Sequence, residues 1–171
     1  MGDWPTERAR HGGVDELPVP DVPGRLLLCG KHYVGPDPQT AMAESGADVV
    51  VCLCEAAELA GRYDGYVAWL RAADGDAALH RPVPDFHVPT PEALHALLDD
   101  IDARLEAGET VLLHCGAGIG RTGTVAAAVL LRHGVALDDA LDVVRTSRPM
   151  AGPEVGAQRD ALEALARAPR R

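Results

Sequence analysis

The sequence from residue 110 to residue 123 is Thr110-Val-Leu-Leu-His-Cys-Gly-Ala-Gly-Ile-Gly-Arg-Thr-Gly123, and this stretch decides the fold. The apolar run at 111–113 predicts a short buried strand that ends at His114 and Cys115. Glycines then alternate with small residues, and a helical pattern begins near Arg121. This order surrounds one point with backbone N–H groups and a helix N-terminus, an arrangement that favours an anion.

Two side chains in this stretch indicate which anion is expected. A cysteine at such a site, here Cys115, has a stabilised thiolate and can be a nucleophile near neutral pH. Arg121, six positions later, offers a planar pair of donors that fits two phosphate oxygens. The pattern predicts attack of sulfur on a phosphoryl group. The expected phosphate-binding residues are Gly116, Ala117, Gly118, Ile119, Gly120 and Arg121.

The motif from His114 to Gly123 resembles the HCxxGxGRTG signature of cysteine-dependent protein tyrosine and dual-specificity phosphatases. The short chain is similar to the compact dual-specificity type, and the resemblance extends more weakly from about Gly24 to Gln158. It implies a dual-specificity-phosphatase-like fold. It also implies a phosphoric monoester hydrolase with a phosphocysteine intermediate and no metal or cofactor.

Three other interpretations compete for this loop. Gly118, Gly120 and Gly123 also fit the dinucleotide-binding fingerprint, but a second helical pattern follows where that fold needs a strand ending in an acid. A Walker loop requires glycine in place of Cys115 and lysine in place of Arg121. A glycine-rich turn beside a buried cysteine is the plain structural alternative, and it leaves the Cys–Arg spacing unexplained.

A phosphatase of this kind needs a proton donor for the leaving alkoxide or phenoxide. Asp85 is the candidate general acid, because it lies in a proline-rich loop 30 positions before Cys115, and such loops can close over a site. The resemblance places the family's general acid at about this position. Asp74 and Asp76 are the next candidates, and a turn aspartate without a catalytic role is the alternative.

Supporting residues follow from the resemblance. It implies that His114 orients the thiolate and that the Thr122 hydroxyl stabilises the departing thiolate in the second step. Arg148 and Gln158 correspond loosely to a later family segment that supports the phosphate loop or places the hydrolytic water. Surface or capping roles are the alternative for these two residues.

The chain has four cysteines, and two of them lie close together in one apolar run. Cys52 and Cys54 have no His or Cys pair downstream with metal-ligand spacing, so we expect buried thiols and no metal. Cys54 resembles the resolving cysteine of some dual-specificity-type phosphatases, which forms a disulfide with the oxidised nucleophile. The alternative is that Cys54 is an inert buried residue.

Strand and helix patterns alternate along the chain, which predicts an α/β fold with a central, mostly parallel sheet flanked by helices. Residues 1–23 are polar and rich in Gly, Pro and charge, so they are expected to be a flexible tail. Residues 24–168 are expected to form a single phosphatase domain. One long helical stretch is predicted from Glu55 to Leu70, and a helix with Thr90 as N-cap from Pro91.

Composition limits the partners. A net charge of −10 over 171 residues argues against nucleic acid or an anionic membrane surface as the main partner. The cysteines, together with the lack of an apolar leader or long apolar run, predict a reducing, cytoplasmic setting. Oligomeric state is not predicted.

The expected function is hydrolysis of phosphotyrosine, with phosphoserine and phosphothreonine as further substrates, in proteins. A phosphatase of inositol phosphates or phosphoinositides is the alternative within the class. Ala117 and Ile119 stand where such a polyanion-binding relative is expected to carry lysines. A catalytically inactive phosphoprotein-binding module is the alternative from another class, against which Cys115, Arg121 and Asp85 argue.

Overall fold

The computed structural model describes residues 4–169, and within them the chain forms one five-stranded sheet. The strands are β1 (Asp15–Leu17), β2 (Arg25–Gly30), β3 (Val49–Cys52), β4 (Ala78–His80) and β5 (Thr110–Cys115). They lie in the order β1-β2-β5-β3-β4, and only the β1–β2 pair is antiparallel. The predicted α/β fold with a mostly parallel central sheet is confirmed.

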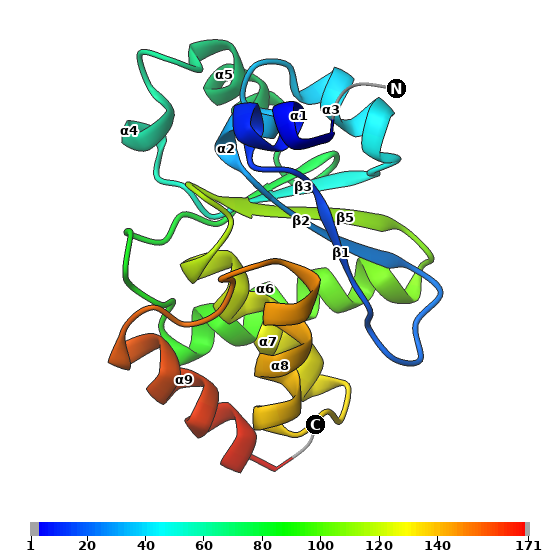
Figure 1. The fold of residues 1–171 in the computed structure, drawn as a ribbon, viewed down its shortest axis with the longest axis vertical. Helices are drawn as coiled ribbons and strands as arrows, with labels where there is room; N and C mark the ends of the chain where they lie inside the picture. Colours follow the sequence, from blue (N-terminus) through cyan, green and yellow to red (C-terminus); the bar gives the residue numbers. More distant parts are fainter. Residues whose placement is uncertain (1–3, 170–171) are drawn as a thin grey trace.

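Helices cover both faces of the sheet (Figure 1). The first group lies on one face and consists of α1 (Trp4–His11), α2 (Lys31–Val34), α3 (Pro38–Ser45), α4 (Ala56–Leu59) and α5 (Asp64–Ala73). The second group lies on the other face and consists of α6 (Pro91–Glu106), α7 (Gly120–Arg132), α8 (Leu137–Ser147) and α9 (Gly156–Arg167). No helix within residues 4–169 has the length and apolar character needed to cross a membrane.

The central strands are buried on both faces because each face is covered by helices. Strand alternation divides their side chains between two cores. Val49 and Val51 pack with the second helix group, whereas Val50 and Cys52 pack with the first. The apolar run at 111–113 is continuous for the same reason, since helices cover β5 on both faces.

The helix predicted from Pro91 begins as expected. The Thr90 hydroxyl accepts a hydrogen bond of 3.2 Å from the backbone N–H of Ala93, and Pro91 occupies the first helical position. The single long helix predicted after Glu55 is wrong, because the chain forms two helices there, α4 and α5. Gly61 between them has a φ of +85°, a left-handed conformation that interrupts a helix.

The N-terminal segment differs from the flexible tail predicted for residues 1–23. From Trp4 onward it contains α1 and β1, and β1 pairs with β2 through the register Asp15↔Leu28 to Leu17↔Leu26. The Leu17 side chain is buried in the core. Three residues with one apolar side chain are too short for a periodic pattern to show, which is why the sequence did not predict this strand.

Candidate active site

The loop after β5 lies at the carboxyl ends of the parallel strands, where it leads into α7. Its backbone packs closely against the end of β2. Gly118 has a φ of +73°, and a Cβ atom there would lie 2.1 Å from the carbonyl oxygen of Cys29. The Lys31 backbone N–H donates to the Gly116 carbonyl at 2.9 Å. Only glycine therefore fits at residue 118, which explains one of the glycines in the motif.

Arg121 is oriented by a carboxylate from α4. Its Nη2 and Nη1 atoms donate to Glu58 Oε1 at 2.7 Å and Oε2 at 2.8 Å, a bidentate pair. Nη1 also donates to the Val83 carbonyl at 2.8 Å. Burial opposes the charged form of Arg121, but the Glu58 carboxylate outweighs it and raises the pKa of the guanidinium, which stays a cation.

The pair also affects Glu58. Burial opposes ionisation of this carboxyl group, but hydrogen bonds from Arg121 and from the Glu55 backbone outweigh burial and lower its pKa. Glu58 is therefore an anion at neutral pH, and it occupies one edge of the arginine fork.

Two buried polar atoms beside this loop have no hydrogen-bond partner among the described residues. They are Arg121 Nε and Thr122 Oγ1. Buried polar atoms without partners are rare, and a native example calls for an explanation. Because Glu58 binds the Nη1–Nη2 edge, the Nε–Nη2 edge of the fork is the one with donor capacity for a ligand.

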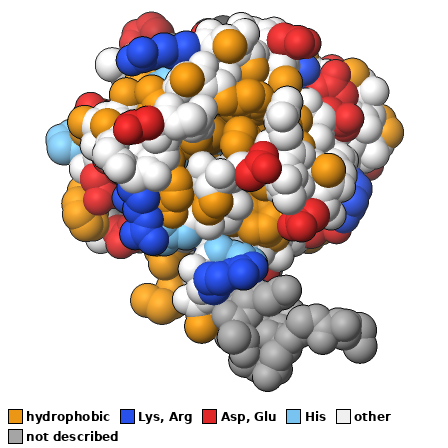
Figure 2. All heavy atoms as spheres, turned by 90° about the horizontal axis from the view of Figure 1, so that it is seen from above, with side chains coloured by type: hydrophobic (Ala, Val, Ile, Leu, Met, Phe, Trp, Pro, Cys, Tyr) orange, Lys and Arg blue, Asp and Glu red, His pale blue; other side chains and the backbone are white. Residues whose placement is uncertain are grey.

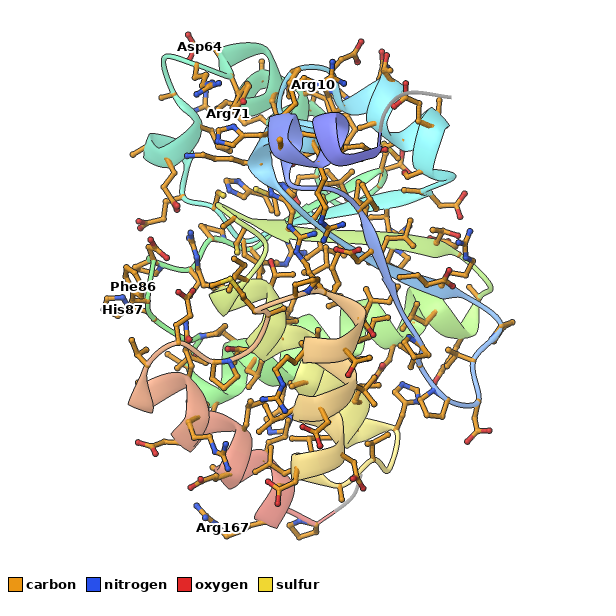
Figure 3. The ribbon with its side chains drawn as sticks, viewed as in Figure 1. Arg10, Asp64, Arg71, Phe86, His87 and Arg167 are labelled. Atoms are coloured by element: carbon orange, nitrogen blue, oxygen red, sulfur yellow. The ribbon has the colours of Figure 1, made fainter. Side chains whose placement is uncertain are left out.

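The proline-rich loop brings Asp85 to Arg121. Asp85 Oδ1 lies 3.4 Å from Arg121 Nη2, and the Asp85 side chain is 57% exposed. The next residue, Phe86, has a φ of +62° and an exposed ring. Figure 3 shows Phe86 and His87 projecting outward from this loop at the edge of the molecule. The loop tip is thus exposed while its base, at Val83, is buried.

Asp74, one of the alternative acids, is engaged elsewhere. Its Oδ1 accepts hydrogen bonds from the His80 backbone N–H at 2.9 Å and from Arg81 at 3.2 Å. The His80 bond is the main reason that the pKa of Asp74 is lowered. These contacts give Asp74 a role in the turn before β4. Of the two, the structure brings Asp85, and not Asp74, into contact with Arg121.

Gln158 on α9 is wholly buried and contacts the proline-rich loop. Its Nε2 donates to the His87 carbonyl at 3.1 Å, and its Oε1 accepts from the Glu154 backbone N–H at 2.8 Å. The structure gives no hydrogen bond between Gln158 and the 116–121 loop. Gln158 therefore ties α9 to the loop that contains Asp85.

Arg148 binds the 116–121 loop directly. Its Nε donates to the Gly118 carbonyl and its Nη2 to the Ala117 carbonyl, both at 2.8 Å. Its Nη1 donates to Asp15 Oδ2 at 2.8 Å and to the Gly13 carbonyl at 3.2 Å. The buried guanidinium thus connects the loop to β1 in the N-terminal segment.

His114 lies under the loop and is wholly buried. Its Nδ1 is 3.1 Å from the Cys115 carbonyl, and its Nε2 is 2.6 Å from the Tyr66 hydroxyl. A carbonyl only accepts, so Nδ1 carries a proton, and in the neutral ring Nε2 accepts from the Tyr66 hydroxyl. Burial raises the pKa of Tyr66, which keeps the phenol protonated for this bond. The tautomer and orientation of His114 are thereby fixed.

Cys54 follows the end of β3 and is buried in the core that faces the first helix group, whereas Cys115 belongs to the core on the other face. A side-chain hydrogen bond with Cys52, in which the Cys54 thiol is the donor, and burial raise the pKa of Cys54, so Cys54 is a neutral thiol at pH 7. The resolving role of Cys54 stays a prediction.

The spacing of residues along the sequence did not predict one cluster of potential metal-ligating atoms. The ligand atoms of Cys52, Cys54 and His114 lie within 4.8 Å of one another, because β3 and β5 are neighbours with Cys52 in register with His114. His114 Nε2 is used by Tyr66, and the Cys52 thiol donates to the Cys54 carbonyl at 3.9 Å. We assign no metal to these groups.

Three site residues were missed by the sequence reasoning. Glu58, Tyr66 and Asp15 contact Arg121, His114 and Arg148 respectively. Each contact joins segments at least 48 positions apart, and no local pattern indicates such pairs. The sequence gives one signal of such a partner. Arg121 follows a buried strand closely, and a buried arginine needs a carboxylate, which the motif itself does not contain.

Comparison with known proteins gives a consistent result. Residues 31–135 match the family model described as "Tc-R-P: Polymorphic toxin system, DSP-PTPase phosphatase". Human dual specificity phosphatase 28 is 30% identical over 158 residues, which span 89% of this chain and 81% of the human protein. The crystal structure of Tk-PTP in the active form has 33% identity and a TM-score of 0.67, covering 84% of this chain and 92% of Tk-PTP. Kinase associated phosphatase has a TM-score of 0.74 at 21% identity, covering 91% and 97% of the two chains, which is a likeness of fold.

Proposed function

The chain belongs to the compact dual-specificity type of the cysteine-dependent protein tyrosine phosphatase superfamily and is a protein phosphatase, and we propose that Cys115 is its nucleophile. Support comes from the position of Cys115 at the end of β5, at the start of a loop whose backbone precedes the N-terminus of α7. In this proposal residues 116–121 bind the phosphate, and Asp85 is the general acid.

The observation that carries the proposal is the unpartnered Nε atom of Arg121. Its Nε is buried without a partner among the described residues, while Glu58 binds the opposite edge of the guanidinium. A phosphoryl group in the loop would receive two parallel hydrogen bonds from Nε and Nη2. Glu58 fixes the plane of the fork in advance, which reduces the ordering needed when substrate binds.

The reaction then follows in two steps. The Cys115 thiolate attacks phosphorus, an S–P bond forms, and the P–O bond to the leaving group breaks as Asp85 donates its proton to that oxygen. Water next attacks the phosphocysteine and gives a proton to the Asp85 carboxylate, the S–P bond breaks, and inorganic phosphate forms. The unpartnered Thr122 hydroxyl is suited to donate a hydrogen bond to the departing thiolate.

We propose phosphotyrosine in proteins as the main substrate. The exposed Phe86 ring next to Asp85 offers an apolar contact for an aryl leaving group. Uncharged side chains at Ala117 and Ile119 argue against a phosphoinositide phosphatase. Because the mechanism needs a reduced thiolate, we propose a reducing compartment such as the cytoplasm as its setting, with no nucleic acid or membrane partner.

The test is turnover of p-nitrophenyl phosphate by the full chain and by Cys115→Ser. We expect the variant to lose all measurable turnover, because serine is not acidic enough to form the nucleophile, and to keep its melting temperature and vanadate binding. Chelation by EDTA is expected to have no effect. Arg121→Lys is expected to lose turnover and vanadate affinity together, because a point charge does not replace the fork. Activity that persists in Cys115→Ser contradicts the proposal.

A further inference from the structure

Helix α4, which contains Glu58, is a single turn at the edge of the first helix group (Figure 1). A helix this short has little stability of its own, so its position depends on contacts with the rest of the protein. Leu59 is buried in the core, and the Glu58 carboxylate binds Arg121. The last carbonyl groups of a helix also need donors from outside it, because they have no intrahelical partner.

Lys31 supplies one of these donors from the start of α2. Its Nζ donates to the Glu58 carbonyl at 3.3 Å, in a partly buried position. Its backbone N–H donates to the Gly116 carbonyl of the 116–121 loop at 2.9 Å. One residue therefore contacts the loop through its backbone and α4 through its ammonium group.

The sheet fixes the backbone of Lys31 beside the loop. The preceding residue, Gly30, is in register with Cys115 across the β2–β5 pair. A Cβ atom at Gly30 would lie 2.9 Å from the Gly116 carbonyl oxygen, so the end of β2 lies tightly against the loop. Because the backbone is held here, the link to α4 depends on the Lys31 side chain.

Lys31 is also the only lysine in a chain of net charge −10. Figure 2 shows acidic side chains spread over the face seen from above, so the side of the first helix group is not generally basic. In the part of the chain that the structure describes, the Lys31 ammonium forms no ion pair that would neutralise it. Burial raises the pKa of Glu58, whereas hydrogen bonds, first those from Arg121, lower it. The charge of Lys31 adds to this lowering, so it acts on the site.

We propose that Lys31 is a positioning residue for phosphate binding, whose ammonium holds α4 against the end of β2 so that Glu58 keeps the Arg121 fork aligned for the phosphoryl group. This proposal rests on the proposed function of the Cys115 loop. Lys31 acts through Glu58 and does not itself contact the substrate. Without this link α4 moves more freely, the bidentate pair forms less often, and more ordering of Arg121 is needed when phosphate binds.

The experiment measures the dissociation constant of vanadate for the full chain and for Lys31→Met. We expect binding to be roughly tenfold weaker in the variant, about the worth of one charge-assisted hydrogen bond. The value of kcat/KM for p-nitrophenyl phosphate is expected to fall by a similar factor. Lys31→Arg is expected to bind vanadate within about threefold of wild type, because the guanidinium keeps the charge and the donor. Arg71→Met is the matched control for charge and is expected to bind like wild type, since Arg71 is an exposed cation of α5 in the same helix group.

A double-mutant cycle with Glu58→Gln separates positioning from a general effect of charge or stability. In the Glu58→Gln background the fork is no longer held by the ion pair. Lys31→Met is therefore expected to weaken vanadate binding there by less than about twofold. Should Lys31→Met not fold, Nε-acetyllysine at residue 31 replaces it, because that side chain keeps the apolar stem and loses the charge.

Three results overturn the proposal. They are wild-type vanadate affinity in Lys31→Met, an equal loss of affinity in the wild-type and Glu58→Gln backgrounds, and an equal loss in Arg71→Met. A lower melting temperature of Lys31→Met with unchanged vanadate affinity belongs to the first of these, and it would assign Lys31 a role in stability alone. Failure of the underlying function is distinct, because wild-type protein would then not hydrolyse p-nitrophenyl phosphate at all.

Discussion

Replacing Arg148 with methionine tests whether the phosphate loop depends on a side chain that lies outside its motif. The change removes hydrogen bonds to the Ala117, Gly118 and Gly13 carbonyls and the ion pair with Asp15. A methionine of similar length keeps apolar contact but leaves the carbonyls without this donor. We therefore expect the variant to have a lower free energy of unfolding and a displaced 116–121 loop.

The magnitude follows from these contacts. Each buried group that loses its partner costs about 1–3 kcal/mol, and breaking a buried ion pair costs about 3–5 kcal/mol. Asp15 keeps its ion pair with Arg8, so we expect the low end, about 3 kcal/mol in the free energy of unfolding. For a chain of this size that lowers the melting temperature by about 6–12 °C. Displacement of the loop by about 1 Å would lower kcat by about 100-fold.

The assays are calorimetry, vanadate titration and turnover of p-nitrophenyl phosphate. Arg145→Met is the matched control, because Arg145 lies three positions before Arg148, in α8, is 66% exposed and among the described residues pairs only with Asp142 at the surface. It should change the free energy of unfolding by no more than about 0.5 kcal/mol. A melting temperature and vanadate affinity for Arg148→Met that match those of Arg145→Met would refute the reasoning.

Three further predictions concern the other site residues. Asp85→Asn should lower kcat by roughly 10²–10⁴-fold for alkyl and phenyl phosphates and much less for leaving groups that need no proton; an equal loss for all leaving groups would assign Asp85 a structural role. Mild peroxide should oxidise the Cys115 thiolate to the sulfenic acid, which should then condense with the Cys54 thiol to a disulfide and water, as peptide mapping without reductant would show. Dithiothreitol should restore activity in wild type but not in Cys54→Ser, and oxidation of Cys115 to sulfonic acid with Cys54 free would contradict this. The lowered pKa of Glu58 means that its ion pair stabilises the protein above the unfolded pKa of 4.5 and that this stability is lost as pH falls through the lower folded pKa. Between pH 5 and pH 3 the melting temperature of Glu58→Gln should therefore fall less than that of wild type. An equal fall in both proteins would contradict a stabilising role of the Glu58 carboxylate.

The parts predicted from sequence are those with a local cause. The strand that ends at Cys115 and the helix after it follow from an apolar run and a helical period, and the Thr90 cap follows from residue types at adjacent positions. Prolines mark the loop of Asp85, which lies beside Arg121, and its role as general acid stays a prediction. Each of these signals lies within a few residues of the feature that it predicts.

The parts not predicted depend on how distant segments meet. Glu58 and Arg121 are 63 positions apart, and Asp15 and Arg148 are 133 apart. Strand order decides these contacts, and strand order does not follow from periodicity. Gln158 illustrates the intermediate case, since the resemblance predicts a supporting residue but not its hydrogen bond to the His87 carbonyl.

The contact between Asp15 and Arg148 also has a consequence for how the chain acquires its activity during synthesis. An aspartate made among the first residues orients an arginine made near the end, and that arginine binds the loop between them. A nascent chain on the ribosome that stops before residue 148 has the complete motif, yet it lacks the Arg148 guanidinium that donates to the Ala117 and Gly118 carbonyls. Pairing at this separation is also slow to form, because the long chain segment must close first. If the loop binds phosphate as we propose, its binding geometry therefore depends on the last third of the chain folding onto the first residues.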